Sequence, residues 1–185
     1  MSGVGVRVTV LCEDRSQNTF ARDFLERTGF HNREIRTKMA PGGSGAASDW
    51  VAKTFPVELQ AYRRRKNSQN VALVVLLDAD NREVEVRKRW LDQLCRDAGI
   101  EPRQDQDCVV YAIPKRNIET WFAYLRGQTV NETATYPRYQ EQRECRKDAA
   151  KLFLLCQNQE SLHSPPPSLA TACAEYRRLL AVRRG

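Results

Sequence analysis

The stretch Val71-Ala-Leu-Val-Val-Leu-Leu-Asp-Ala-Asp80 decides the fold class, because a continuous apolar run ends abruptly in two aspartates one residue apart. Val/Leu runs of this kind are typical of a strand buried on both faces of a parallel sheet. Ligands of such sheets bind beyond the carboxyl ends of the strands. Two carboxylates at that position suit Mg²⁺, which takes one or two of them and keeps its other sites for water and phosphate. The sequence therefore predicts a metal and phosphate site after strand 71–77.

A second acidic site follows another predicted strand. Residues 6–12 alternate and then run apolar before Glu13 and Asp14, and a helical pattern continues from there to Gly29. Short connections and right-handed crossovers favour neighbouring strands. If strands 6–12 and 71–77 lie side by side, Glu13, Asp78 and Asp80 meet at one edge of the sheet.

These motifs resemble the TOPRIM superfamily, the metal-dependent catalytic domain of topoisomerases, bacterial primases, OLD-family nucleases and small stand-alone nucleases. The family has a glutamate after its first strand and Asp-x-Asp after a later one, which match Glu13 and Asp78-Ala79-Asp80. The segment Ala112-Ile-Pro-Lys-Arg-Asn-Ile-Glu-Thr-Trp-Phe122 is similar to a segment of small TOPRIM-like proteins of bacterial defence systems and mobile elements. One departure is Asp14, which stands where the family usually has glycine.

The resemblance implies a Mg²⁺- or Mn²⁺-dependent nuclease. Asp78 and Asp80 would hold the metal, and Glu13 would be a second ligand or the general acid/base. Lys115 or Arg116 would stabilise charge on the phosphoryl group, and Glu119 would be an additional ligand or the anchor of those cations. The expected substrate is DNA or RNA, and the expected protein partner is another subunit of a defence complex.

Each of these residues also has a purely structural interpretation. Asp78 and Asp80 are residue types favoured in turns and helix caps, and Glu13 suits the first turn of a helix. Lys115 and Arg116 can be ordinary solvated charges. Glu119 lies beside core residues and needs a partner in either case.

The remaining pattern predicts an α/β fold: a central, mostly parallel four- or five-stranded sheet flanked by helices, with C-terminal helical additions. We expect a short strand within 31–39, a helix over 48–66 that is kinked at Pro56 or begins there, a helix over 82–98, a strand over 108–113 and a helix over 117–126. Residues 1–126 would form the TOPRIM-like domain. Residues 127–185 would form a helical appendage packed on it, with helices over 140–157 and 169–183 separated by a stiff polyproline spacer, 164–168. The glycine-rich loop 41–45 is either a substrate-facing loop or a plain connector.

The composition of the chain indicates which kinds of partner it would bind. The net charge of +7 and pI near 9.3 favour polyanions. The cluster Arg63-Arg-Arg-Lys66 suits a helix end or a nucleic-acid backbone. There is no apolar run long enough to span a bilayer and no signal-peptide pattern, so we expect a cytoplasmic protein without membrane contact. The six cysteines show no zinc spacing and are interpreted as reduced structural thiols.

Two other classes of function fit the same residues. Receiver domains also have an acidic pair after strand one, an aspartate after strand three and a later lysine, which match Glu13-Asp14, Asp78 and Lys115. Alternatively, the chain is a non-catalytic nucleic-acid-binding subunit in which the acidic residues are structural.

Overall fold

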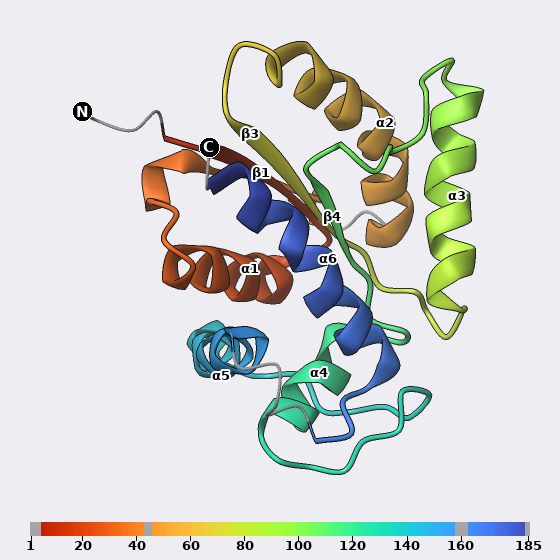
Figure 1. Cartoon of the computed structure of the whole chain (residues 1–185). Helices are drawn as coiled ribbons and strands as arrows, with labels where there is room; N and C mark the ends of the chain where they lie inside the picture. Colours follow the sequence, from red (N-terminus) through yellow and green to blue (C-terminus); the bar gives the residue numbers. More distant parts are fainter. Residues whose placement is uncertain (1–4, 43–45, 158–162, 184–185) are drawn as a thin grey trace.

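The computed structural model describes residues 5–42, 46–157 and 163–183, and contains one four-stranded sheet (Figure 1). The strands are β1 (Arg7–Cys12), β2 (Ile35–Met39), β3 (Val71–Leu76) and β4 (Val109–Ala112). All three pairings are parallel, and the strand order is β2-β1-β3-β4. The predicted α/β class is confirmed, with four strands and no antiparallel pair among the described residues.

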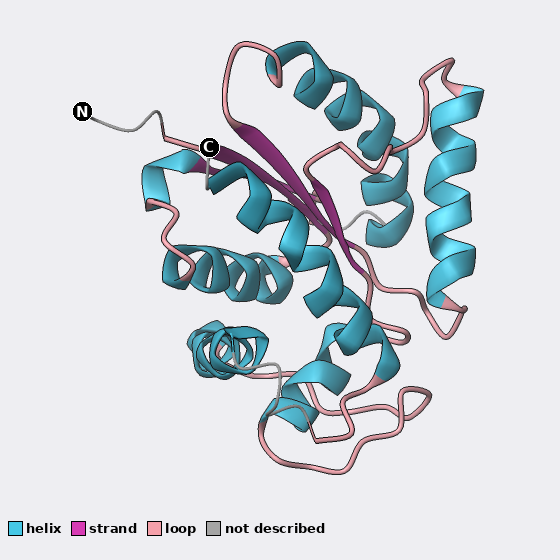
Figure 2. Ribbon diagram, in the orientation of Figure 1, coloured by secondary structure: helices cyan, strands magenta, loops and turns pink. Residues whose placement is uncertain are grey.

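Helices flank this sheet and extend beyond it (Figure 2). They are α1 (Arg15–Arg27), α2 (Ala47–Arg65), α3 (Val84–Asp97), α4 (Ile118–Leu125), α5 (Cys145–Gln157) and α6 (Pro167–Arg183), with short 3₁₀ turns η1 (Asn32–Glu34) and η2 (Gln142–Glu144). In the part of the chain that the structure describes, no helix combines the length and apolar character needed to cross a bilayer.

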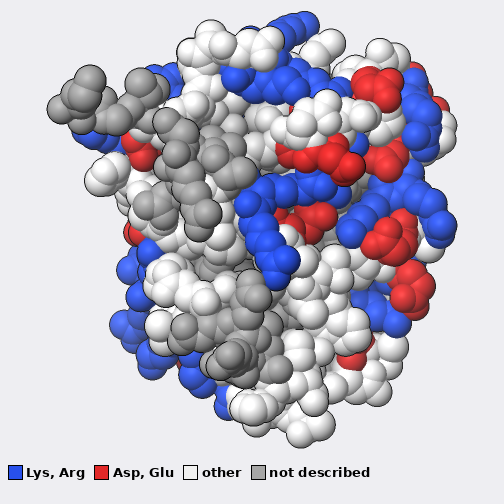
Figure 3. All heavy atoms as spheres, in the orientation of Figure 1, with Lys and Arg blue, Asp and Glu red and all other residues white. Residues whose placement is uncertain are grey.

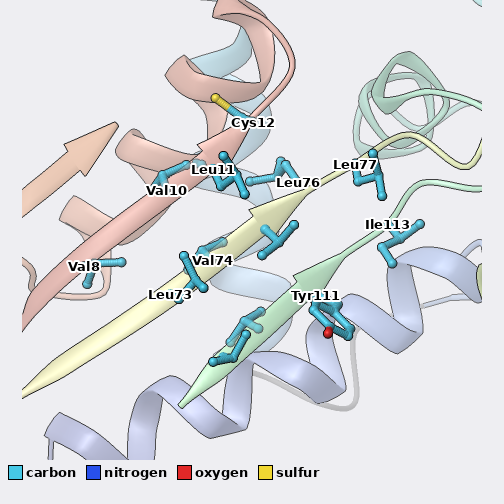
Figure 4. Packing of buried hydrophobic residues seen from close by; sticks show 14 of the residues in the cluster. Val8, Val10, Leu11, Cys12, Leu73, Val74, Leu76, Leu77, Tyr111 and Ile113 are labelled. Atoms are coloured by element: carbon cyan, nitrogen blue, oxygen red, sulfur yellow. The ribbon is translucent and has the colours of Figure 1, made fainter. Parts of the chain in front are cut away.

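Different helices cover the two faces of the sheet. Side chains alternate along each strand, so every strand contributes residues to both faces. On one face, Val74 and Val110 line a small cavity together with residues of α1, α4, α5 and α6. On the other, Tyr111 of β4 packs edge to face against Phe55 of α2, with ring centroids 5.6 Å apart. Helix α3 contacts α2 on the outside of that layer. Figure 4 shows the central residues of this two-sided core, including Leu73 and Val74 on successive positions of β3.

β3 lies between β1 and β4, and its residues from Val71 to Leu76 are all buried. This burial explains the continuous apolar run. β4 is an edge strand, and side chains cover its free edge: Glu175 of α6 accepts a hydrogen bond from the Tyr111 N–H at 3.1 Å, and Arg103 donates to the Val109 carbonyl at 2.9 Å. The backbone groups of Tyr111 and Val109 on this edge are therefore already hydrogen-bonded and cannot pair with a strand of another chain.

Several element boundaries differ from the sequence predictions for local reasons. Helix α2 begins at Ala47 and continues through Pro56, so a start at the proline is wrong. Helix α3 begins at Val84 and not at residue 82, because Glu83 takes an extended N-cap conformation with φ −67° and ψ 141°. The predicted spacer is shorter than expected, since α6 already begins at Pro167, a position where proline is favoured.

The residues after 126 pack on the rest of the chain. Helix α5 contacts α1, and α6 contacts β4. Trp121 of α4 is buried and donates its indole N–H to Ser168 Oγ at the start of α6, 2.8 Å away. These contacts tie the C-terminal helices to the helix that carries Glu119.

Candidate active site

The candidate site lies where the direction of the chain across the sheet reverses. β1 has β2 on one side and β3 on the other, and ligands of open parallel sheets bind at this kind of switch point, beyond the carboxyl ends of the strands. Glu13 directly follows β1, and Asp78 follows β3 by two residues. The Glu13 carboxylate accepts a hydrogen bond from the Asp78 backbone N–H at 2.5 Å. The predicted adjacency of these two strands is therefore confirmed.

A glutamine that the sequence analysis missed holds the two acidic residues in place. Gln17 is fully buried in the first turn of α1. Its side-chain oxygen accepts from the Glu13 N–H at 2.9 Å, and its side-chain nitrogen donates to Asp78 Oδ1 at 3.0 Å. The spacing Asp14-x-x-Gln17 could have indicated it, since this is the pattern of a capping box. Asp14 is indeed the N-cap of α1 and accepts from the Gln17 N–H at 2.9 Å.

Negative charge accumulates at this edge. The pKa of the Glu13 carboxyl is raised to about 7, mainly by burial and also by the charges of Asp80 and Asp14, while the hydrogen bond from Asp78 lowers it. Burial also raises the pKa of Asp78 well above its ordinary value, with repulsion from Glu13, Glu119 and Asp14 adding to the effect. None of the ion pairs formed within residues 5–42, 46–157 and 163–183 includes Glu13, Asp14 or Asp78. Within the described residues, these three carboxyl groups therefore lack a cationic side chain as a partner.

Asp80 sits nearby but faces a different partner. Its side chain is 56% exposed and forms an ion pair of 2.5 Å with Arg87, which is itself buried in α3. Backbone hydrogen bonds hold the loop, from the Ala79 N–H to the Pro114 carbonyl at 2.8 Å and from the Asn81 N–H to the Lys115 carbonyl at 2.9 Å. The turn interpretation applies to Asp80, which takes a left-handed conformation. Its role as a metal ligand stays a prediction.

Arg87 is the second residue that sequence reasoning missed. It occupies the apolar face of α3, three residues after Val84 and four before Leu91, and a charged residue on such a face needs a partner. The guanidinium lies over the Trp90 ring, 4.7 Å from its centroid. This helical spacing was the signal that could have revealed it.

The two cations predicted for the site are engaged elsewhere. Lys115 Nζ pairs with Glu83 Oε1 at 2.9 Å, which raises the Lys115 pKa. Arg116 donates to the carbonyl of Thr133 at 2.9 Å. Both follow β4 at the same edge as the carboxylates, and their proposed contact with phosphate stays a prediction.

Glu119 is buried in the first turn of α4. Its ion partner is Arg138, at 3.6 Å, while Lys115 and Arg116 have the other partners described above. Burial raises the Glu119 pKa, and its charge also raises that of Asp78. Glu119 is therefore close enough to influence the charge of Asp78, although it lies in α4, after the loop that follows β4.

The acidic residues have the ligand type that a hard divalent cation prefers, but their side chains are not arranged around a common point. No three His, Cys, Asp or Glu side chains within the described ranges are arranged to hold a metal ion. Mg²⁺, however, needs only one or two carboxylates, with water and phosphate as its other ligands. Glu13 and Asp78, which have no cationic partner among the described residues, fit that requirement.

Half of the basic cluster 63–66 serves the fold. Arg63 and Lys66 both bind Asp107, whose side chain is fully buried, at 2.6 and 2.8 Å. Arg64 and Arg65 are exposed, and Arg64 donates to Gln60 Oε1 at 3.1 Å. In the glycine-rich loop 41–45, residues 43–45 lie outside the described part of the chain, so neither interpretation of that loop is tested.

Comparison with protein-family models, curated proteins and solved structures gave no significant match to this chain, so the TOPRIM resemblance rests on the motifs quoted above.

Proposed function

We propose that this chain is a metal-dependent nuclease that hydrolyses phosphodiester bonds in DNA or RNA. The observation that carries the proposal is the group of carboxylates Glu13, Asp14 and Asp78, which lies at the switch point of the sheet without an ion-pair partner among the described residues. A divalent cation would relieve their repulsion, and a cation held by only two or three carboxylates keeps sites for phosphate oxygens.

The chain's own residues have distinct roles in this proposal. Glu13 and Asp78 bind the metal, and Gln17 orients both of them through its two hydrogen bonds. Mg²⁺ or Mn²⁺ bound there supplies Lewis-acid stabilisation of the phosphoryl charge. Glu13 alternatively acts as the general acid/base. Both roles require its carboxylate at the end of β1.

Asp80 and Lys115 would join the site only after small rearrangements, because each is paired with another residue. The Asp80 carboxylate is mostly exposed, so its second oxygen is free to bind the metal while the first stays on Arg87. Lys115 would leave Glu83, whose side chain is 70% exposed. Exposed ion pairs contribute little to stability, so substrate phosphate can compete for Lys115.

The test is a cleavage assay on linear, circular and structured DNA and RNA with Mg²⁺, Mn²⁺ or EDTA. We expect EDTA-sensitive cleavage. Glu13→Gln keeps the size and the hydrogen-bond acceptor but removes the charge, and should lower the rate by about 10²–10⁴-fold with binding retained. Glu26→Gln, at the exposed opposite end of α1, is the matched control and should cut like the wild type.

Two outcomes separate this proposal from its alternatives. Wild-type activity that survives in Glu13→Gln would show that the role assignment is wrong. Binding that is insensitive to chelator, without turnover on any substrate, would favour a non-catalytic nucleic-acid-binding subunit. On the face shown in Figure 3, the described basic and acidic side chains are interspersed. The charge of this face therefore does not distinguish a nuclease from a non-catalytic nucleic-acid-binding subunit.

A receiver-like phospho-acceptor is the second candidate, and one observation favours it. The strand order β2-β1-β3-β4 is that of the first four strands in flavodoxin-like doubly wound sheets, which include receiver domains. Against it, the amine of Lys115 pairs with Glu83 and not with Asp78. Incubation with a small acyl phosphate and Mg²⁺ tests it: phosphate on Asp78 would support the receiver, and no labelling would leave the nuclease favoured.

A further inference from the structure

Two cysteines of the C-terminal helices have sulfur atoms in unusually close contact. Cys156 is the next-to-last residue of α5, and Cys173 lies in α6, 17 positions later. Their Sγ atoms are 2.7 Å apart, whereas a disulfide bond needs about 2.05 Å. Both side chains are half-buried, so a small reagent has access to them.

We propose that Cys156 and Cys173 form a reversible intramolecular disulfide that ties α5 to α6, with a low-molecular-weight disulfide such as glutathione disulfide as the oxidant. The interpretation of all six cysteines as inert structural thiols would then hold for four of them only. The proposal does not depend on nuclease activity.

The other four thiols are poor competitors for oxidation. Cys12, Cys95, Cys108 and Cys145 are all buried. Burial raises the pKa of Cys12 and Cys108 to about 12 and that of Cys95 and Cys145 to about 11. Since the thiolate is the nucleophile in exchange with a disulfide, these groups react slowly.

Space beside the pair permits the bond to form. An apolar cavity of about 60 Å³ adjoins both cysteines and is lined also by Phe24, Leu152 and Tyr176. Interiors are otherwise closely packed, and a change of side-chain rotamer normally forces neighbours to move. Here the two sulfur atoms can rotate toward the cavity while they adopt disulfide geometry.

The exchange proceeds in two steps. The hydrogen bond from Cys156 lowers the pKa of Cys173, so the Cys173 thiolate attacks glutathione disulfide, forms a mixed disulfide and releases one glutathione thiolate. The same hydrogen bond raises the pKa of Cys156 as long as Cys173 is a thiolate. In the mixed disulfide that thiolate is gone, so Cys156 gives up its proton, its sulfur attacks the Cys173 sulfur, and the second glutathione leaves. Two protein thiols are oxidised, and one glutathione disulfide is reduced to two glutathione molecules, which take up the two protons.

The test uses the full chain, fully reduced and then incubated with glutathione disulfide. Free thiols are alkylated, and the protein is digested and mapped by mass spectrometry without reduction. The expected product is a peptide pair linked through Cys156 and Cys173, with an intact mass lower by two hydrogen atoms before alkylation. The linkage should also raise Tm by about 5–10 °C, and dithiothreitol should reverse the rise.

Matched alanine variants complete the design, because alanine is well tolerated inside helices. Cys173→Ala should give neither the link nor the rise in Tm, whereas Cys95→Ala in α3 should keep both. Oxidation of the wild type that yields only glutathione adducts, dimers between chains, or a link to another cysteine would overturn the proposal. This mapping of the wild type decides the matter even if a variant folds poorly.

Discussion

Replacing Glu13 by glutamine should stabilise the metal-free protein at neutral and alkaline pH. Glu13 is half-buried beside Asp78 and repelled by the charges of Asp80 and Asp14. Glutamine retains an oxygen that can accept the hydrogen bond from the Asp78 N–H, but it carries no charge. The variant therefore removes the repulsion while keeping the contact that joins β1 to β3.

The magnitude follows from the pKa of Glu13, which rises from 4.5 to about 7. At about 1.4 kcal/mol per pKa unit this corresponds to roughly 3–4 kcal/mol. Partial hydration and the sharing of protons with Asp78 reduce it, so we expect a gain on the order of 1–3 kcal/mol.

The sign of the pH dependence is set by the raised pKa. Folded Glu13 binds its proton more tightly than unfolded Glu13, so its contribution to stability is full at low pH and is lost as pH rises from about 4.5 to about 7. Glutamine does not ionise, so the variant does not lose stability in this way as pH rises. The stability difference between variant and wild type should be near zero at about pH 4 and largest at about pH 8.

Urea unfolding in EDTA at a series of pH values measures this difference, and Glu26→Gln serves as the control. Adding Mg²⁺ at about pH 8 should narrow the gap, because the cation stabilises the wild-type carboxylates more than the variant. A difference that stays flat with pH, or a variant that is less stable than the wild type at pH 8, would refute the reasoning.

Three further predictions concern the acidic edge and its surroundings. Asp78→Ala should abolish Mg²⁺ and Mn²⁺ binding in calorimetry while far-ultraviolet circular dichroism shows an intact fold; unchanged affinity would remove Asp78 from the site. Arg87→Met should raise Mg²⁺ affinity a few-fold if Asp80 is a ligand, because it frees that carboxylate from its 2.5 Å ion pair; an unchanged affinity would place Asp80 outside the site. Asp107→Ala should lower the free energy of unfolding by about 2–3 kcal/mol in urea, less than for a wholly buried pair because Arg63 and Lys66 can still reach water; a loss below about 0.5 kcal/mol would show that this pair is not structural.

The sequence by itself determined the fold class, a mostly parallel sheet flanked by helices, and the placement of acidic residues after two of its strands. The run from Val71 to Leu77 is too apolar for a solvent-facing strand, and it lies in the centre of the sheet. Glu13 and Asp78 were expected to meet because each directly follows a predicted strand, 6–12 or 71–77, and parallel strands present their carboxyl ends at one edge. Local pattern was sufficient for the central strand, whereas the pairing of β1 with β3, which brings the two carboxylates together, came from the structure.

Only the tertiary structure decided which groups neutralise or orient these acids. Gln17 binds Glu13 and also Asp78, which lies 61 positions later in the sequence. Arg87 pairs with Asp80, and Lys115 pairs with Glu83. The contact between Cys156 and Cys173 likewise depends on how α5 and α6 pack. Hydrogen bonds and ion pairs depend on distances of a few tenths of an ångström and on side-chain direction. Hydrophobic periodicity carries no information on either quantity, because it reports only which face of an element is buried.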